Sequence, residues 1–274
     1  EYMYEKGICD VDFVICNTDY QALRNSPIPC KIQLGKELTA GHGAGNNPAM
    51  GEKSAQESLA DIEAILKKDT RMAFITAAMG GGTGTGAAPV IARLSKDMGI
   101  LTVGIVSVPA RFEGPKRLDQ ARDGLRRLKD HVDCLIVIDN EKIKSIYGSQ
   151  TISQAFAKAN DVLNIAAKGI AEIITLPGYI NVDFADVRTV MTDSGVAIMG
   201  AAQASGEDRA IRAITEALES PLLNNNDILG AKDILLNITS GTDEITMDEM
   251  SQITSHIIRK VGNNAAVIWG VGTD

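Results

Sequence analysis

The sequence predicts an α/β protein in which a parallel-sheet domain is joined by a long central helix to a smaller α/β domain. Three observations lead to this prediction. Apolar segments of strand length alternate with amphipathic segments of helix length, which is typical of a parallel sheet covered by helices. A run rich in glycine at residues 80–86 separates one such strand from the helix that follows it. A long helical pattern at residues 151–175 then divides the chain into two unequal parts.

The elements of the first domain follow from their apolar patterns. The strands, apolar along most of their length, are expected at residues 11–16, 31–34, 72–79, 100–108 and 132–138. The helices, each with one apolar face, are expected at residues 54–68, 87–98 and 115–130. The chain opens at residues 2–7 on a segment that resembles the last turn of a helix and its glycine stop.

The second domain follows the long helix, which Leu176-Pro177-Gly178 is expected to end. Its strands are expected at residues 195–202, 233–239 and 265–271, and its helices at residues 207–219 and 247–261. We therefore divide the chain into a first domain at residues 1–148, a connecting helix at residues 149–176 and a smaller domain at residues 177–274.

Composition excludes several classes of function. The chain has 27 Lys and Arg against 35 Asp and Glu, a net charge of −8, which argues against general binding to nucleic acid or to an anionic membrane. The four cysteines form no Cys-x-x-Cys pair and are interpreted as reduced structural thiols. The three histidines are far apart, so no metal site or histidine-centred catalytic site is predicted. No signal peptide is evident, and the longest apolar run, at residues 100–110, is shorter than the ~18 residues of a membrane span.

The glycine run is the strongest indication of function. Five of the seven residues at 80–86 are glycine and the other two are Thr83 and Thr85. We expect this composition to form a loop rather than part of a packed helix, because glycine clusters where a backbone bends sharply or approaches another group closely. A loop between a strand and a helix directs N–H groups and the helix N-terminus toward an anion, usually a phosphate. The two threonines can donate to phosphate or cap the helix.

Three kinds of phosphate loop compete. A Walker A loop requires a lysine that this run lacks. The spacing Gly82-x-Gly84-x-x-Ala87 fits a dinucleotide fingerprint, but the next strand ends at Val108-Pro109 without an acidic residue for the ribose. The third kind binds phosphates through backbone N–H groups and threonine hydroxyls. Residues 80–90 as a whole resemble this third kind, the signature of the tubulin/FtsZ GTPase family and of its bacterial branch.

The resemblance covers essentially the whole chain in the family's motif order. Residues 41–48 are similar to a second phosphate loop, residues 112–117 to a ribose-side segment, residues 159–161 to a guanine-recognition segment, and residues 181–187 to a catalytic loop. The resemblance implies GTP or GDP as the ligand, with Mg²⁺ at the γ-phosphate, although no residue pattern indicates the ligands of the metal. The nucleotide-binding residues that it implies are Asn17, Gly43, Ala44, Gly45, Gly80, Gly81, Gly82, Thr83, Gly84, Thr85, Gly86, Glu113, Arg117, Asn140, Phe156, Asn160 and Asp161.

Several of these residues also have an ordinary structural interpretation. Asn17 can cap a turn, Glu113 and Arg117 can form a surface ion pair four residues apart, and Phe156 can belong to the core. Asp161 has a chemical reason to select guanine, because a carboxylate can accept from both the N1–H and the exocyclic amine, which adenine does not offer together.

The catalytic loop has two interpretations. Asp183 and Asp186 have the spacing of a capping box at the start of a helix. The resemblance instead implies that subunits stack head to tail in an open filament and that Asn181, Asp183 and Asp186 complete the GTP site of a neighbouring copy. There, carboxylates can orient and polarise the water that attacks the γ-phosphate.

The resemblance also implies a cytoplasmic protein of the mid-cell division site, whose filaments drive bacterial cell division. It implies a strand and a further glycine loop before Tyr2, and a final strand and an adaptor-binding tail after Asp274, all absent from this chain. The expected partners are other copies of the chain and division adaptors, with no nucleic acid and no direct membrane contact. The alternatives are a non-hydrolysing assembly module and, from the dinucleotide fingerprint, an NAD enzyme.

Overall fold

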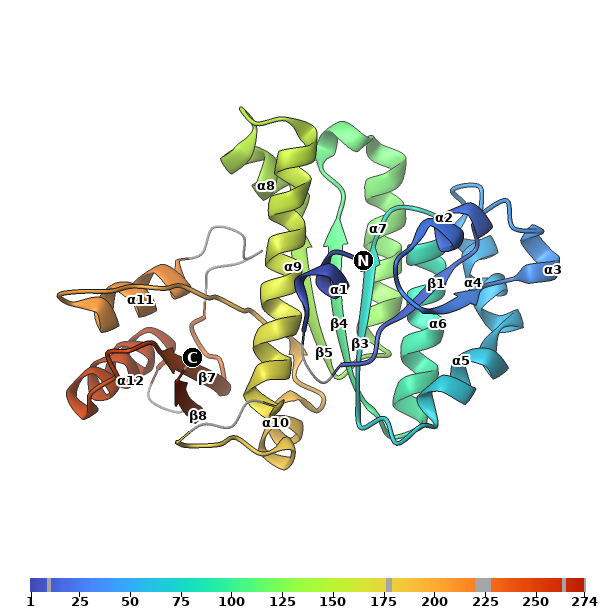
Figure 1. Cartoon of the computed structure of the whole chain (residues 1–274). Helices are drawn as coiled ribbons and strands as arrows, with labels where there is room; N and C mark the ends of the chain where they lie inside the picture. The colour runs from blue at the N-terminus through green and yellow to red at the C-terminus, as the bar shows by residue number, and fades with distance from the viewer. Residues whose placement is uncertain (9–10, 176–178, 220–227, 263–264, 274) are drawn as a thin grey trace. The chain divides into compact units, whose positions relative to one another are not determined.

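The computed structural model describes residues 1–8, 11–175, 179–219, 228–262 and 265–273. It divides into two compact units (Figure 1). The first contains Glu1–Asn164 and Thr192–Ala197, and the second contains Ile165–Met191 and Ile198–Asp274. The long helix α9 (Ile152–Thr175) contributes residues to both units. The predicted stop of this helix, at residues 176–178, lies outside the described residues.

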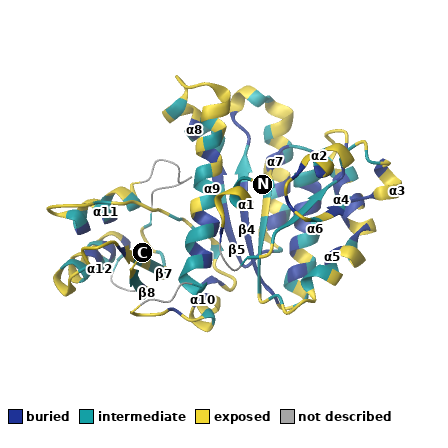
Figure 2. Cartoon of the chain, viewed as in Figure 1, coloured by how far each residue is buried: buried dark blue, intermediate teal, exposed yellow. Residues whose placement is uncertain are grey.

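Parallel strands form the sheets of the first unit, as predicted. The main sheet has the order β3-β4-β5-β6, with the strands β3 (Met72–Ala78), β4 (Leu101–Val108), β5 (Cys134–Asp139) and β6 (Gly195–Val196). A separate parallel pair consists of β1 (Val14–Asn17) and β2 (Cys30–Gln33). β4 is almost completely buried because it pairs on both sides and is covered by helices (Figure 2).

Helix α6 (Thr83–Asp97) lies between two hydrophobic clusters of this unit. Its Ala88 and Ala92 pack with Val106 of β4 and Leu128 of α7 (Pro115–Lys129). Its opposite face packs against β1, β2 and the two helices α4 (Pro48–Glu57) and α5 (Leu59–Leu66). The small side chains of α6 allow this burial on two sides, and the helix is therefore held rigidly against the sheet.

The remaining helices of the first unit are short. They are α1 (Tyr2–Lys6), α2 (Tyr20–Asn25), α3 (Lys36–Thr39), α4 (Pro48–Glu57), α5 (Leu59–Leu66), the 3-10 helix at Arg111–Glu113 and α8 (Asn140–Tyr147). The predicted glycine stop of α1 is confirmed, because Gly7 has a left-handed φ of 68°. The single helix expected at residues 54–68 is instead two helices that meet at Ser58, whose hydroxyl accepts from Gly35 N–H at 3.1 Å.

The second unit is a smaller α/β structure. Its elements are α10 (Phe184–Met191), α11 (Arg209–Leu218), β7 (Asp233–Ser240), α12 (Met247–Val261) and β8 (Ala266–Thr273), with β7 and β8 parallel. The Nε atom of Arg209 on α11 lies 2.6 Å from the Oε1 atom of Glu249 on α12, and this ion pair joins the two helices. This pairing holds the pKa of Glu249 down to about 2. None of the helices in the described ranges is both long and apolar enough to cross a membrane.

The strand expected at residues 195–202 was predicted wrongly. Only Gly195 and Val196 pair, and they extend the first unit's sheet beside β5. Backbone hydrogen bonds explain the placement, because the N–H groups of Gly195 and Ala197 donate to the carbonyls of Asp133 and Leu135 at 3.0 Å. The Lys96 ammonium adds ion pairs to Asp133 at 3.3 Å and to Asp193 at 2.7 Å. The apolar pattern of the segment gave no sign of these contacts with the first sheet and with Lys96.

Candidate functional site

The glycine run follows β3 and continues directly into α6. The helix begins at Thr83, so the prediction that it begins at Ala87 was wrong. Glycine is tolerated inside this helix because another backbone lies against it. A Cβ atom on Gly86 would lie 2.6 Å from Glu52 N and closer still to the Pro48 carbonyl oxygen, both in α4. The glycines therefore permit close packing of two helices as well as a bend.

The bend itself is at Gly80, which has a φ of 98°. Its N–H donates to the hydroxyl of Thr85 at 2.8 Å, and Thr85 is completely buried. A Cβ atom on Gly80 would lie 2.9 Å from the carbonyl oxygen of Arg117. The loop is thus closed internally by Thr85, and α7 packs against its outer side.

Thr83 occupies the N-terminus of α6. In the part of the chain that the structure describes, no side chain caps this terminus at Gly82. The Thr83 hydroxyl lies 2.7 Å from the hydroxyl of Thr18. A helix N-terminus without a cap has N–H groups and a partial positive charge available to an anion.

The second glycine loop lies directly against the first. A Cβ atom on Gly82 would lie 2.9 Å from Ala44 Cβ and 2.7 Å from Asn47 N. Gly43 N–H donates to the Thr18 carbonyl at 3.3 Å, and Asn47 caps α4 by accepting from Ala49 N–H. Gly43 and Gly45 have left-handed φ angles of 85° and 58°, which explains the choice of glycine at these positions.

The residues after β1 connect the two loops. The Asn17 side chain accepts from Asp19 N–H at 3.1 Å, so it makes the turn contact that its structural interpretation predicts. Asp19 caps α2 and pairs with His42 as an isolated β-bridge. Thr18, completely buried between them, was missed by the sequence analysis. A threonine with apolar or short polar neighbours carries no pattern that distinguishes it from an ordinary core residue.

Glu113 and Arg117 form the predicted ion pair at 3.0 Å. Glu113 also accepts from Ala110 N–H at 2.9 Å, which fixes the segment before α7. The backbone contact between Arg117 and Gly80 brings this pair to the first glycine loop. Both interpretations of the pair are therefore compatible with its position.

A buried amide follows β5. Asn140 is the first residue of α8, and Asp139 caps that helix by accepting from Glu141 N–H at 2.9 Å. The Oδ1 atom of Asn140 is buried and has no hydrogen-bond partner among the described residues. Buried side-chain oxygens are normally paired, so this atom is suited to accept from a bound ligand.

The predicted base-recognition residues lie on the part of α9 that belongs to the first unit. Asn160 is exposed and Phe156 is 40% exposed, so Phe156 is not a fully buried core residue. Asp161 accepts a hydrogen bond from the Tyr2 hydroxyl and lies 3.6 Å from the Lys158 ammonium. The contact with Asp161 raises the pKa of Tyr2. Tyr2 is a second residue that the sequence analysis did not associate with the site.

The predicted catalytic loop belongs to the second unit. Asp183 caps α10 by accepting from Asp186 N–H at 2.8 Å, as its structural interpretation predicts. Asp186 lies in the first turn and is exposed. Asn181 is also exposed. The cap therefore fixes the Asp183 carboxylate against the backbone, while both Asp183 and Asp186 are exposed.

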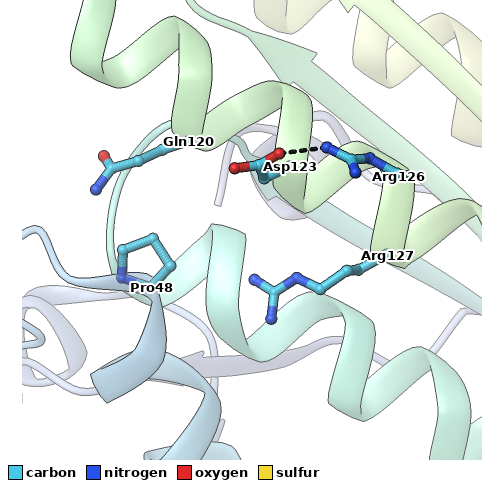
Figure 3. Close-up of a pocket in the computed structure, with 5 residues that line it drawn as sticks. All are labelled: Pro48, Gln120, Asp123, Arg126 and Arg127. Carbon is cyan, nitrogen blue, oxygen red and sulfur yellow. Dashed lines mark hydrogen bonds and ion pairs between the residues drawn. The ribbon is translucent and has the colours of Figure 1, made fainter.

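A shallow pocket lies beside the second glycine loop (Figure 3). It is lined by Pro48, Gln120, Asp123, Arg126 and Arg127. Arg126 pairs with Asp123, and Arg127 pairs with Glu52 at 2.7 Å. Gln120 donates to the carbonyl of Asn46 at 3.1 Å, which ties α7 to the loop. The two arginines of the pocket are already paired with carboxylates, so we interpret these residues as stabilising the second glycine loop rather than as binding an anion.

Within the described ranges, no group of three or more His, Cys, Asp or Glu side chains is arranged to hold a metal ion. Single oxygen groups beside the glycine loops include the hydroxyl of Thr83 and the carboxylate of Asp19, whose Oδ1 atom accepts from the N–H groups of Gln21 and Ala22.

Comparisons with known proteins give a consistent assignment. Residues 1–148 match the model of the GTPase domain of the Tubulin/FtsZ family, and residues 195–274 match that of the FtsZ family C-terminal domain. The cell division protein FtsZ of Porphyromonas gingivalis is 48% identical over 99% of this chain and 60% of its own length. That of Buchnera aphidicola is 48% identical over 100% of this chain and 71% of its own length. The empty FtsZ dimer of M. jannaschii has a TM-score of 0.91 at 43% identity, covering 99% of this chain and 78% of that one.

Proposed function

This chain belongs to the tubulin/FtsZ family, and we propose that it binds GTP, assembles head to tail with other copies and hydrolyses GTP where two copies meet. The observation that carries the proposal is the meeting of two glycine loops at the uncapped N-terminus of α6. Backbone N–H groups, the helix dipole and the Thr83 hydroxyl together can bind the phosphates without a lysine.

Guanine selection is assigned to Asp161 and Asn140. The Asp161 carboxylate can accept from the N1–H and the exocyclic amine of guanine. The unpaired oxygen of Asn140 supports a second contact to the nucleotide, and Phe156 offers a partly exposed ring to the base. The Glu113–Arg117 pair is assigned to the ribose and phosphate side.

Mg²⁺ is proposed to accompany the γ-phosphate. This ion usually keeps several waters and takes one or two protein oxygens besides the phosphates. The Thr83 hydroxyl and the Asp19 carboxylate have suitable chemistry for that limited role. When bound, Mg²⁺ would neutralise charge on the phosphates.

Hydrolysis is proposed to use the second unit of a neighbouring copy. Asp183 would hold the loop through its cap, while the exposed Asp186, with Asn181, would orient and polarise water against the γ-phosphate. The dimeric state named for the M. jannaschii relative supports self-association. Head-to-tail contacts that do not close into a ring would give an open filament.

In the cell, we propose that these filaments act in the cytoplasm at the mid-cell division site and engage division adaptors. We also retain the division into a nucleotide domain at residues 1–148, a connecting helix at residues 149–176 and an assembly domain at residues 177–274. The family-model matches at residues 1–148 and 195–274 support its outer parts.

The test is phosphate release from GTP across a range of protein concentrations, with filaments followed by light scattering. Activity per molecule should rise with concentration because the site is completed by a second copy. Asp186→Ala should abolish hydrolysis while filaments still form. Asp248→Ala removes a matched carboxylate from the first turn of α12 and should leave the rate unchanged. Parental hydrolysis by Asp186→Ala would refute the catalytic assignment, whereas GTP-dependent filaments without hydrolysis in the parent would indicate a non-hydrolysing assembly module.

A further inference from the structure

Thr18 is a buried residue that touches both glycine loops. Its side chain is 0% exposed, and its hydroxyl lies 2.7 Å from that of Thr83 in the first loop. Its carbonyl oxygen accepts from Gly43 N–H in the second loop at 3.3 Å. The same carbonyl accepts from the Thr39 hydroxyl at 3.3 Å. One residue thus holds segments that are far apart in the sequence.

A phosphate bound at the start of α6 would favour one of the two possible proton arrangements of this hydroxyl pair. Each hydroxyl has one proton to donate and can accept from others. The two hydroxyl oxygens lie 2.7 Å apart, and either can donate to the other. Thr83 lies at the partly exposed start of α6, where a phosphate can only accept. If Thr18 donates to Thr83, the proton of Thr83 is left to point outward.

We propose that Thr18 is a positioning residue for phosphate binding. It donates to the Thr83 oxygen, which restricts the Thr83 hydroxyl to one rotamer and directs its proton toward a phosphate oxygen. Aligned hydroxyls polarise one another, so the outer hydrogen bond is strengthened by the inner one. Through its carbonyl, Thr18 also keeps the second glycine loop beside the first. This inference rests on the proposed phosphate site at residues 80–86.

A purely structural role for Thr18 makes a different prediction. If the buried hydroxyl only stabilises the fold, its removal should weaken the binding of all ligands equally or of none. Loss of a residue that orients a hydrogen-bond donor toward phosphate should weaken the binding of ligands that carry phosphates and leave the others unchanged. The comparison of guanosine with GDP and GTP therefore separates the two roles.

The experiment measures the affinities of the chain for guanosine, GDP and GTP by calorimetry. Thr18→Val replaces the hydroxyl with a methyl group of similar size and keeps the backbone carbonyl. It should weaken the binding of GDP and GTP roughly 5- to 20-fold, less than the full loss of a hydrogen bond to a charged group because Thr83 keeps its hydroxyl and loses only its fixed orientation, and leave the binding of guanosine unchanged. Thr18→Ser retains the hydroxyl and should restore most of the affinity.

Thr102→Val is the matched control. Thr102 is also 0% exposed, and its hydroxyl donates to the Ser95 hydroxyl at 2.8 Å, away from the glycine loops. The Thr102→Val variant should have a lower thermal stability than the parent and the same preference for GDP over guanosine. If Thr18→Val does not fold, Thr18→Ala removes the same hydroxyl with less steric demand.

A double-mutant cycle tests the route through Thr83. If Thr18 acts through Thr83, Thr18→Val combined with Thr83→Val should bind GDP no more weakly than Thr83→Val alone. Additive losses, or a full preference for GDP in Thr18→Val, would overturn the role of Thr18 while leaving the phosphate site intact. A parent chain that does not distinguish GDP from guanosine would refute both the phosphate site and this inference.

Discussion

Gly86→Ala tests the finding that the glycine run brings two helices into backbone contact. The added Cβ would lie 2.6 Å from Glu52 N and closer still to the Pro48 carbonyl oxygen. Ordinary contact begins near 3.4 Å, so the contact with Glu52 N alone requires α4 and α6 to separate by 0.8 Å, and the nearer Pro48 oxygen requires more. Both obstacles are backbone atoms of α4, the helix that follows the second glycine loop.

The magnitude follows from two opposing effects. Overpacking a tight contact costs about 1–3 kcal/mol, and backbone obstacles favour the upper part of that range. Replacement of glycine by alanine inside a helix returns about 1 kcal/mol. We expect a net loss of about 2 kcal/mol in the free energy of unfolding, together with weaker GDP binding because the two loops move apart.

The assay is denaturant unfolding followed by far-UV circular dichroism, with GDP affinity measured on the folded protein. The fluorescence of Trp269, the single tryptophan of the chain, reports on the second unit in the same samples. Gly169→Ala is the control, since its Cβ would lie 2.7 Å from only the flexible end of Met199. That variant should match or exceed the parent in stability. Parental stability and affinity in Gly86→Ala would refute the close-packing explanation.

Three further predictions concern other sites. The pKa of Glu249 is lowered from 4.5 to about 2 beside Arg209, so Glu249→Gln should lower the free energy of unfolding by about 1–2 kcal/mol at pH 7. In urea unfolding experiments, this difference between variant and parent should disappear as the pH falls from 4.5 to 2. Asp161→Asn should weaken GDP binding about 100-fold and improve the binding of xanthosine diphosphate, because the amide complements the xanthine edge. Calorimetry measures both affinities, and an unchanged affinity for GDP would show that Asp161 does not recognise the base. Burial raises the pKa of the Cys134 thiol to about 11, so Cys134 should react with a disulfide reagent at pH 8 only after unfolding, and rapid labelling of Cys134 in the folded chain would contradict its burial.

Much of the fold could be predicted from the apolar strands. The central strands at 72–79, 100–108 and 132–138 were found within two residues of their observed ends, because buried parallel strands are apolar throughout. The short helices at Lys36–Thr39 and Asn140–Tyr147 were missed. Their residues are largely polar or depend on local caps, so a hydrophobic period gives little indication of them.

The errors at the glycine run and at residues 195–202 have a common cause. Both depend on contacts between segments distant in sequence, which a local pattern does not contain. Glycine inside α6 is explained by the backbones of α4 and of Ala78 in β3, and the short β6 strand by its hydrogen bonds to β5 and its neighbours and by the ionic contacts of Lys96. Thr18 and Tyr2 were missed for the same reason, since their partners are Thr83 and Asp161.

The most direct test of the central claim mixes two inactive variants. Asp161→Ala should lose the nucleotide, and Asp186→Ala should lose the hydrolytic loop. In a mixed filament, an Asp186→Ala copy holding GTP meets an intact loop from an Asp161→Ala copy at about one interface in four. We predict that an equal mixture releases phosphate at up to roughly a quarter of the parental rate, while each variant alone stays at background. A mixture no faster than the sum of its parts would contradict an active site shared between two copies.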